Sequence, residues 1–311
     1  MNTDVKVFSA LKSLFNSGSY NADRFYSAEI EQKFLGLLDD HSFDGIIFDS
    51  LYTLPYLAAI RNSFDGKIAV RTHNVEYRLW EQYAAEASGL KKWYLKRLAA
   101  DLKRFERNKL NEVNTIFSIS KDDTTVFVED GVHTPIVDIP VTIETTTSNF
   151  DIHANRIYHL GMMDWEPNRQ AVNQLIEWMP ELRATIPQLE LHIAGSKSEQ
   201  YIEKDESKGI FVHGFVDSVD DFSRTHGILV SPIKAASGVR IKFLEAMAMG
   251  IPILTTTVGA LGIEHASCDC LCIADSKVDF IRNIQELTSN PEKRKEIGPV
   301  SYTHLTLPTT M

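Results

Sequence analysis

The residues best placed to do chemistry lie in one segment, SPIKAASGVRIKFLEAMAMGIPILTTTVGALGIE, at 231–264. Its pattern predicts a strand, a loop containing Gly238, a helix at 239–249 and a second strand. A glycine ahead of a helix lets the backbone approach a ligand, and the helix start offers unpaired N–H groups and a partial positive charge. Arg240 and Lys242 fall in the predicted first turn, where cations oppose the helix dipole. The segment therefore predicts a site for a phosphate or diphosphate.

Helical spacing ranks the charged residues of this segment. At about 100° per residue, Lys242 and Glu245 lie roughly 60° apart on one face, whereas Arg240 and Lys242 lie roughly 160° apart. We therefore rank Lys242 and Glu245 first, with a surface salt bridge at three-residue spacing as the alternative to ligand binding. The chain contains no Asp-x-Asp sequence, the usual carboxylate clamp for a bridging divalent metal, so we expect no metal ligands.

The elements that must position these residues alternate between short β-branched runs and amphipathic stretches. That alternation predicts an α/β fold, in which βαβ units build parallel sheets covered by helices. A long helix is expected at 77–113, broken near Ser88 and Gly89 because glycine costs about 1 kcal/mol in a helix interior. Another is expected at 168–185. Strands are expected at 45–49, 68–72, 115–119, 135–139, 156–160, 189–194, 210–213, 228–231, 253–256 and 271–274.

Length and composition divide the chain. At about 150 residues per domain, the 311 residues predict two domains. The Thr- and Ser-rich stretch 141–155 lacks a helical period, and we assign it as a linker between domains at 1–140 and 156–299. The first 40 residues read as helices where a Rossmann-like domain opens with a strand, so we expect a truncated first domain. Residues 300–311 break the pattern without any charged side chain and are interpreted as an artefactual tail.

Charge and hydropathy exclude further classes of protein. Lys and Arg total 32 against 42 Asp and Glu, and the net charge of −10 argues against a nucleic-acid partner. No run approaches about 18 uncharged apolar residues, and the start lacks a secretory signal, so we expect a cytoplasmic protein. Cys268, Cys270 and Cys272 lack paired C-x-x-C spacing, which favours strand positions over a zinc or redox site.

The segment SGVRIKFLEAMAMGIPILTTTVGALGI resembles the donor-site signature of family 4 retaining glycosyltransferases, which have the GT-B architecture of two Rossmann-like domains facing across a cleft. The family pattern commonly reads E-x7-E. Glu245 matches the second glutamate, while Ser237 stands at the first, as in a branch of the family with Gly-Thr-Arg-Leu-Lys before the same glutamate. The resemblance implies that Glu245 binds the nucleotide ribose, and that Arg240 and Lys242 stabilise the leaving diphosphate in place of a metal.

Further segments match the same family in the expected order. The segment 158–195 resembles the opening strand, loop and helix of the donor domain, which implies that Gly161 and Asn168 lie beside the donor. The segment RTHNVEYRLWEQY resembles the one carrying the histidine of the sugar pocket, which implies that His73 touches the transferred sugar. Gly214 and Phe215 resemble a turn whose backbone reads the base, with a core position for Phe215 as the alternative.

The helix expected at 89–109 carries eight Lys or Arg residues against two acidic ones, with Trp93 and Tyr94 among them. That mix is compatible with peripheral contact with an anionic lipid surface, which would suit a lipid-linked acceptor. A solvated helix face is the commoner explanation, and both stay open. Ser120 has two readings as well: it could face a cleft, or it could cap the helix beginning at Lys121.

The resemblance implies a metal-independent enzyme of polysaccharide biosynthesis. It would move a sugar from a nucleoside-diphosphate-sugar to a glycan or lipid-linked acceptor with retention, needing no cofactor besides the donor substrate. The expected catalytic residues are His73, Arg240 and Lys242, and the expected donor-binding residues are Gly161, Asn168, Gly214, Phe215, Gly238 and Glu245. An inactive nucleotide-sugar-binding protein or fragment and a two-domain sugar epimerase are the alternatives. Base, sugar and acceptor are not encoded in any motif of the chain.

Overall fold

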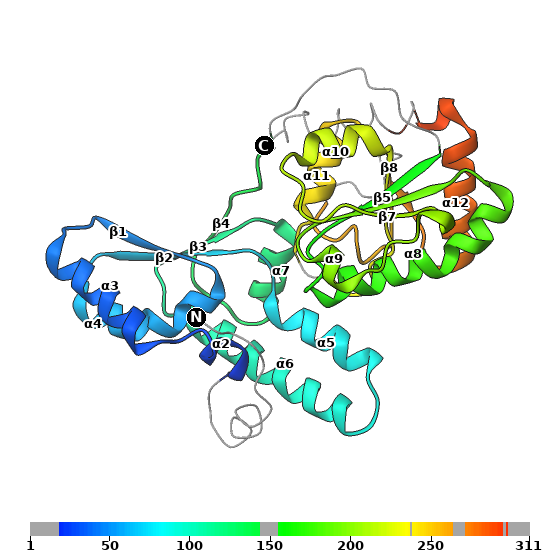
Figure 1. Ribbon diagram of the computed structural model, residues 1–311. Coiled ribbons are helices and arrows are strands. Elements are labelled where there is room, and N and C mark those ends of the chain that lie inside the picture. Colours follow the sequence, from blue (N-terminus) through cyan, green and yellow to red (C-terminus); the bar gives the residue numbers. More distant parts are fainter. Residues whose placement is uncertain (1–18, 144–154, 237, 264–270, 295–296, 298–311) are drawn as a thin grey trace. The chain divides into compact units, whose positions relative to one another are not determined.

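The computed structural model describes residues 19–143, 155–236, 238–263, 271–294 and 297, and the chain divides into two compact units (Figure 1). Unit 1 comprises Met1–Val141 with Ser237–Val239, and unit 2 comprises Thr142–Ala236 with Arg240–Met311. Most of the predicted linker, the predicted tail and the cysteines at 268 and 270 lie outside the described residues. Cys272 is a half-buried strand residue that forms no disulfide within the described part of the chain, in agreement with the prediction.

Unit 1 is built on a four-stranded parallel sheet in the order β1-β2-β3-β4. The strands form where the β-branched runs were predicted, and Ile68, Val70 and Ile116 are fully buried. Register pairs Asp49 with Arg71, so the carboxyl ends of β1 and β2 lie at the same edge. The strand bounds are β1 Gly45–Asp49, β2 Lys67–Thr72, β3 Thr115–Ser118 and β4 Ile136–Asp138.

The helices of unit 1 follow the predicted breaks. The long helical stretch divides at Gly89, which has a left-handed φ of 59°. Ser120 caps α7, because its hydroxyl accepts hydrogen bonds from the backbone N–H groups of Asp122 and Asp123. The helix bounds are α2 Tyr20–Asp23, α3 Ala28–Asp40, 3₁₀ helix η1 Leu51–Tyr56, α4 Leu57–Ser63, α5 Glu76–Glu86, α6 Gly89–Leu110 and α7 Lys121–Glu129.

Unit 2 is built on a six-stranded parallel sheet in the order β10-β9-β8-β5-β6-β7. The chain runs outward from the central β5 to β6 and β7, then returns to β8 beside β5 and runs outward the other way. This is doubly wound topology with its switch point between β5 and β8, where open α/β sheets place ligands. The strand bounds are β5 Arg156–Leu160, β6 Glu190–Ala194, β7 Ile210–Val212, β8 Ile228–Ser231, β9 Ile253–Thr255 and β10 Cys272–Ile273.

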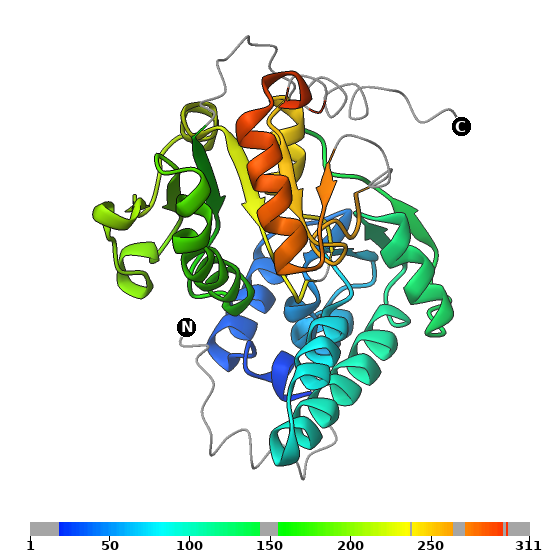
Figure 2. The same ribbon diagram turned by 90° about the vertical axis from the view of Figure 1, so that its right-hand side faces the viewer.

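Helices cover both faces of this sheet. The long helices α8 and α12 pack against each other on one face (Figure 2), and α10 packs against β5. None of the helices within the described ranges is long and apolar enough to cross a bilayer. The helix bounds are α8 Glu166–Thr185, α9 Ser198–Tyr201, 3₁₀ helix η2 Glu206–Lys208, α10 Val219–His226, α11 Ile241–Ala248 and α12 Lys277–Ser289.

Two predicted helix starts need correction. The helix expected from residue 239 begins at Ile241, because the chain leaves Gly238 in the left-handed region and stays extended through Arg240. Arg240 is therefore the N-cap, and its carbonyl accepts the first hydrogen bond from the Phe243 N–H. The helix expected from residue 168 begins at Glu166, because Pro167 fits the first turn, where its missing N–H costs nothing.

Candidate functional site

The switch point of unit 2 gathers residues from three elements around one lysine amine. Lys242, in the first turn of α11, donates from Nζ to the carbonyl of Leu160, the last residue of β5, at 2.8 Å. The same Nζ lies 3.3 Å from Oδ1 of Asn168, a buried residue near the start of α8. The amine thus joins the carboxyl end of β5 to the starts of two helices.

Asn168 extends this network into the core. Its amide nitrogen donates to the Met162 carbonyl at 3.0 Å, and its Oδ1 lies 3.3 Å from Nε2 of His159. The other ring nitrogen of His159 lies 3.1 Å from the Val230 carbonyl on β8. Burial, together with the Lys242 charge, lowers the pKa of His159 to about 3. The ring is therefore neutral and has one proton to donate to one of these two oxygens.

The environment of Lys242 disfavours its charge. Burial lowers the pKa of the Lys242 amine to about 7, with the positive charge of Arg240 as the second cause. The guanidinium carbon of Arg240, itself a buried residue, lies 5.9 Å from the centre of the Trp165 ring. Both hydrogen-bond acceptors of Lys242 are neutral oxygens. A bound anion would offset both the burial and the repulsion, so this corner of unit 2 is electrostatically suited to phosphate.

Glu245 lies one turn further along α11. Lys242 is bonded to Leu160 and Asn168 and forms no salt bridge with Glu245 among the described residues, so the alternative of a simple surface ion pair is wrong. Glu245 is half-buried, and burial raises the pKa of its carboxyl. A carboxylate in such a place can accept hydrogen bonds from ligand hydroxyl groups.

Two glycines allow the loops around Asn168 to pack tightly. A Cβ on Gly161 would lie 2.4 Å from Nδ2 of Asn168. Gly195, with φ of 131°, would place a Cβ 2.0 Å from the Gly161 carbonyl oxygen. The close approach at Gly161 is thus made by Asn168. Sequence reasoning missed Gly195, although a glycine directly after a strand was a signal for it.

The predicted base-reading turn is ordered by backbone contacts. Gly214 adopts φ of 70°, and its carbonyl accepts a hydrogen bond of 2.7 Å from the Gly195 N–H. Phe215 beside it is 75% exposed, so the core alternative for this ring is wrong. Gly238 also has a left-handed φ, of 68°, which explains glycine at the position before α11.

His73 in unit 1 belongs to an exposed ion-paired group. Its Nε2 donates to Oδ1 of Asp49 at 2.8 Å, and a guanidinium nitrogen of Arg71 lies 3.7 Å from the same oxygen. Strand register brings the three together at the carboxyl edge of β1 and β2, where His73 was predicted. Asp49 was missed by sequence reasoning, although its position at a strand end was the available signal.

A second group in unit 1 was also missed. The Tyr52 hydroxyl donates to Glu76 at 2.8 Å, and the Glu76 N–H donates to Glu106 at 3.2 Å. Burial raises the pKa of Glu76 to about 7, and burial with the neighbouring Glu76 raises the pKa of Glu106 well above its usual range. Glu76 stands three residues after His73 in the matched segment, which was a usable signal; Glu106 gave none.

The basic helix predicted at 89–109 turns its acidic residues inward. Asp101 is buried and accepts hydrogen bonds from Arg97 and Arg104, and Glu106 is buried as described above. Leu90 and Trp93 are exposed large apolar residues of α6. Lipid contact through α6 stays a prediction.

Comparison with known proteins finds a family match within the second unit. Residues 154–290 match the family model described as Glycosyl transferases group 1. A relative from Klebsiella pneumoniae, described as an uncharacterized 44.6 kDa protein in a cps region, is 25% identical over 276 residues, which cover 82% of this chain and 68% of that protein.

Solved structures share the fold of the chain. TarM of S. aureus superposes with a TM-score of 0.67 at 14% identity, covering 89% of this chain and 55% of TarM, so the chain spans about half of that protein. Sucrose-phosphate synthase from Thermosynechococcus elongatus gives 0.66 at 14% identity, covering 89% and 72%. HepE from Anabaena gives 0.67 at 14% identity, covering 90% and 77%.

These structures have the GT-B fold, and the two parallel α/β sheets of this chain match it. The predicted GT-B fold class is confirmed. Together with the Glycosyl transferases group 1 domain, the shared fold supports a GT-B glycosyltransferase.

Proposed function

We propose that the protein is a family 4 retaining glycosyltransferase that moves a sugar from a nucleoside-diphosphate-sugar to a glycan or lipid-linked acceptor in polysaccharide biosynthesis. One observation carries the proposal. Lys242 and Arg240 meet at the switch point of unit 2, where the Lys242 amine is held on neutral oxygens with a lowered pKa. A bound diphosphate would offset the burial and the charge repulsion that lower the pKa of the Lys242 amine.

The chemistry needs a stabilised leaving group. As the bond between the sugar and the diphosphate breaks, negative charge grows on the departing phosphate oxygens, and fixed donors stabilise it without reorganising. Lys242, Arg240 and the N-terminal N–H groups of α11 would serve as these donors in place of a metal. Glu245 would accept hydrogen bonds from the ribose hydroxyls. The exposed Phe215 and the backbone beside it would contact the base.

His73 would orient the transferred sugar from unit 1. Its Nε2 proton is committed to Asp49, which leaves Nδ1 to accept a hydrogen bond from a sugar hydroxyl. Asp49 then acts as a positioning residue, because it holds the ring in one orientation.

The ligands found in the structurally similar proteins guide the choice of donor. TarM has been crystallised with UDP and alpha-GlcNAc-glycerol, and HepE with UDP and glucose. The cps-region relative supports a role in polysaccharide biosynthesis. We therefore propose UDP-sugars as the first donors to test. We also propose a cytoplasmic protein that needs no cofactor, with α6 as the candidate for lipid contact.

The decisive experiment screens UDP-, GDP- and ADP-sugars by thermal shift and then measures nucleotide release with and without acceptor. Stabilisation by one donor, followed by acceptor-dependent transfer with retained anomeric configuration in the presence of EDTA, supports the proposal. Stabilisation without turnover indicates an inactive binding protein, and a new sugar isomer formed without acceptor indicates an epimerase. No stabilisation by any donor contradicts the proposal at its first step.

A further inference from the structure

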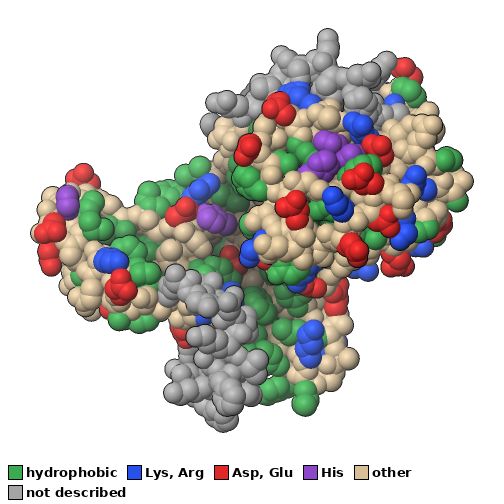
Figure 3. Space-filling view, viewed as in Figure 1, with side chains coloured by type: hydrophobic (Ala, Val, Ile, Leu, Met, Phe, Trp, Pro, Cys, Tyr) green, Lys and Arg blue, Asp and Glu red, His purple; other side chains and the backbone are tan. Residues whose placement is uncertain are grey.

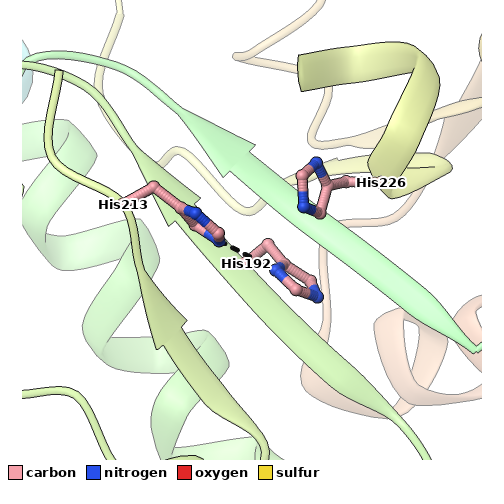
Figure 4. Close-up of side chains that lie close together, drawn as sticks. All are labelled: His192, His213 and His226. Atoms are coloured by element: carbon pink, nitrogen blue, oxygen red, sulfur yellow. Dashed lines mark hydrogen bonds between the residues drawn. The ribbon is translucent and has the colours of Figure 1, made fainter. Parts of the chain in front are cut away.

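Three histidines come together in unit 2 at a place that the proposed transfer does not use. His192 lies in the middle of β6, His213 directly follows β7, and His226 ends α10 (Figure 4). One ring nitrogen from each lies within 4.8 Å of the other two. Within the described ranges, this is the one group of three or more His, Cys, Asp or Glu residues with such convergent ligand atoms.

Hydrogen bonds fix which nitrogens face the centre of the cluster. His226 donates from Nδ1 to the Phe222 carbonyl at 2.7 Å, which leaves the lone pair on Nε2. His192 places Nε2 3.1 Å from the carboxylate of Glu190, a contact that favours the proton there and the lone pair on Nδ1. That Nδ1 lies 2.9 Å from Nε2 of His213. Donation of the far ring nitrogen to a carboxylate or carbonyl is how metal-binding histidines are oriented.

The three rings are packed against neighbouring side chains. Burial lowers the pKa of all three imidazoles, and the pKa of His192 falls to about 4, with His226 as the next cause. Phe211 stacks on His192 and Phe222 stacks on His226, with ring centres 4.8 Å and 4.1 Å apart. A metal ion uses the lone pair of each ring, so the hydrogen bond between Nδ1 of His192 and Nε2 of His213 must break as the ion binds.

One carboxylate, that of Glu190, contacts a ring of the cluster. Glu190 faces His192 and is held by Nε of Arg156 at 2.8 Å, so its charge is shared with a guanidinium. The carboxylate thus orients His192 and stays outside the set of three ring nitrogens. A site of imidazole ligands alone suits zinc, copper, cobalt or nickel, whereas magnesium and calcium require oxygen ligands.

We propose that His192, His213 and His226 bind one divalent transition-metal ion, with zinc as the first candidate. Zn–N bonds of about 2.0–2.1 Å in tetrahedral geometry put ligand nitrogens about 3.3 Å apart. The ring nitrogens of the three histidines are up to 4.8 Å apart, and rotation of the side chains would bring them to this spacing. The exposed His213 has room to rotate. Histidine side chains gather on the surface beside α10 (Figure 3), so an ion has access from solvent, which supplies the fourth ligand.

Such an ion would tie together three elements of unit 2. It would link the middle of β6, the residue after β7 and the end of α10. His213 directly precedes Gly214 and Phe215, so the ion would also hold the predicted base-reading turn. The metal would stand outside the Lys242 site and take no part in sugar transfer, and the inference holds whether or not the protein is a transferase.

The test is calorimetric titration of the full chain with zinc chloride, after removal of any affinity tag. All proteins carry serine in place of Cys268, Cys270 and Cys272, so that thiolates contribute no binding. We expect one zinc ion per chain and no competition from magnesium. His213→Gln and His226→Gln should each weaken zinc binding at least tenfold, while His133→Gln, an exposed histidine of unit 1, should leave it unchanged.

Two further measurements separate a built site from loose surface binding. Cobalt bound by the parent should give the intense visible spectrum of tetrahedral coordination, and His213→Gln should abolish it. Glu190→Gln should weaken zinc about tenfold to a hundredfold while one ion still binds per chain. Absence of zinc binding by the parent overturns the proposal, and so does equal binding by the parent and the His213→Gln protein. Because His213 is exposed, that variant decides the question even if a variant of the buried His226 unfolds.

Discussion

The two units hold their basic side chains in opposite ways. In unit 2, the amine of Lys242 is desolvated, lies on two neutral oxygens and has its pKa lowered to about 7. In unit 1, Arg71 and His73 are exposed and share the carboxylate of Asp49. An exposed ion pair is stable without a ligand and contributes little to folding. A desolvated cation on neutral partners costs folding free energy, and a bound anion would recover that cost.

A carboxylate of unit 1, that of Glu76, extends this comparison. Glu76 in unit 1 is desolvated like Lys242, and its pKa moves in the opposite direction, up to about 7, because burial favours the neutral form of either group. Glu76 in unit 1 and Lys242 in unit 2 therefore each have a pKa of about 7. The two groups differ in their position relative to the sheet of their unit. Lys242 lies at the switch point of unit 2, while Glu76 is the first residue of α5, three residues after His73.

The largest effect should come from removing the Lys242 charge. Lys242→Met should weaken binding of the nucleoside-diphosphate-sugar about a hundredfold, because a charge-assisted hydrogen bond to a buried anion contributes about 1.5–3 kcal/mol. Isothermal calorimetry with the best donor measures the change. Lys204→Met, at an exposed lysine of unit 2, is the matched control and should bind like the parent. Equal affinity for the Lys242→Met protein would remove the basis of the proposed function.

Lys242 and Glu76 should make the free energy of unfolding depend on pH in opposite directions. Lys242 has a folded pKa below its unfolded value, so unfolding takes up a proton between about pH 7 and 10, and its contribution to stability rises with pH there. Glu76 has a folded pKa above its unfolded value, so its contribution is full below about pH 4.5 and is lost as pH rises through about 7. Each slope is at most about 1.4 kcal/mol per pH unit.

Urea unfolding of the ligand-free protein across pH 4 to 10 measures both slopes. Lys242→Met should reduce the rise in stability above pH 7 relative to the parent. Glu76→Gln should reduce the fall between pH 4.5 and 7, to which Glu106, with its raised pKa, also contributes. Saturating donor should also abolish the rise in stability that Lys242 causes above pH 7, because a bound diphosphate would raise the pKa of the amine and keep it charged. Unchanged slopes in both variants would show that neither group is desolvated in solution.

A smaller effect is expected at the ion-paired group of unit 1. Asp49→Asn should lower kcat of transfer about tenfold with little change in donor affinity, because His73 loses the partner that orients its ring. Folding stability should stay nearly unchanged, since the pair is exposed. Asp65→Asn, at another exposed aspartate of unit 1, controls for the loss of one charge. A fall in donor affinity without a fall in kcat would contradict the positioning role.

The strands of both units could be predicted from the sequence, whereas the side-chain contacts between distant segments could not. The β-branched runs place every strand, because local hydrophobic pattern decides which residues enter a parallel sheet. The partners of Lys242 lie 82 and 74 residues away, and no local signal shows that its amine reaches Leu160 and Asn168. The histidine cluster was missed for the same reason, since β6, the end of β7 and the end of α10 meet only in the folded sheet. The start of α11 was also predicted wrongly, because the left-handed Gly238 keeps the chain out of the helix until Ile241 although the residue pattern is helical from 239.

The smallest predicted effect tests how far the ligand site of unit 2 extends from Lys242. Phe215 is 75% exposed beside the ordered Gly214, and an exposed aromatic ring there is suited to stack on a base. Phe215→Leu should weaken donor binding about threefold to tenfold, because stacking of an aromatic pair contributes about 0.5–1.5 kcal/mol. Leucine keeps the apolar surface, so the loss reports stacking rather than hydrophobic burial. Tyr201→Leu, an exposed aromatic residue of the same unit, should leave donor affinity unchanged. If both variants bind the donor like the parent, the base lies elsewhere, and the site defined by Lys242 recognises the diphosphate without reading the base at this turn.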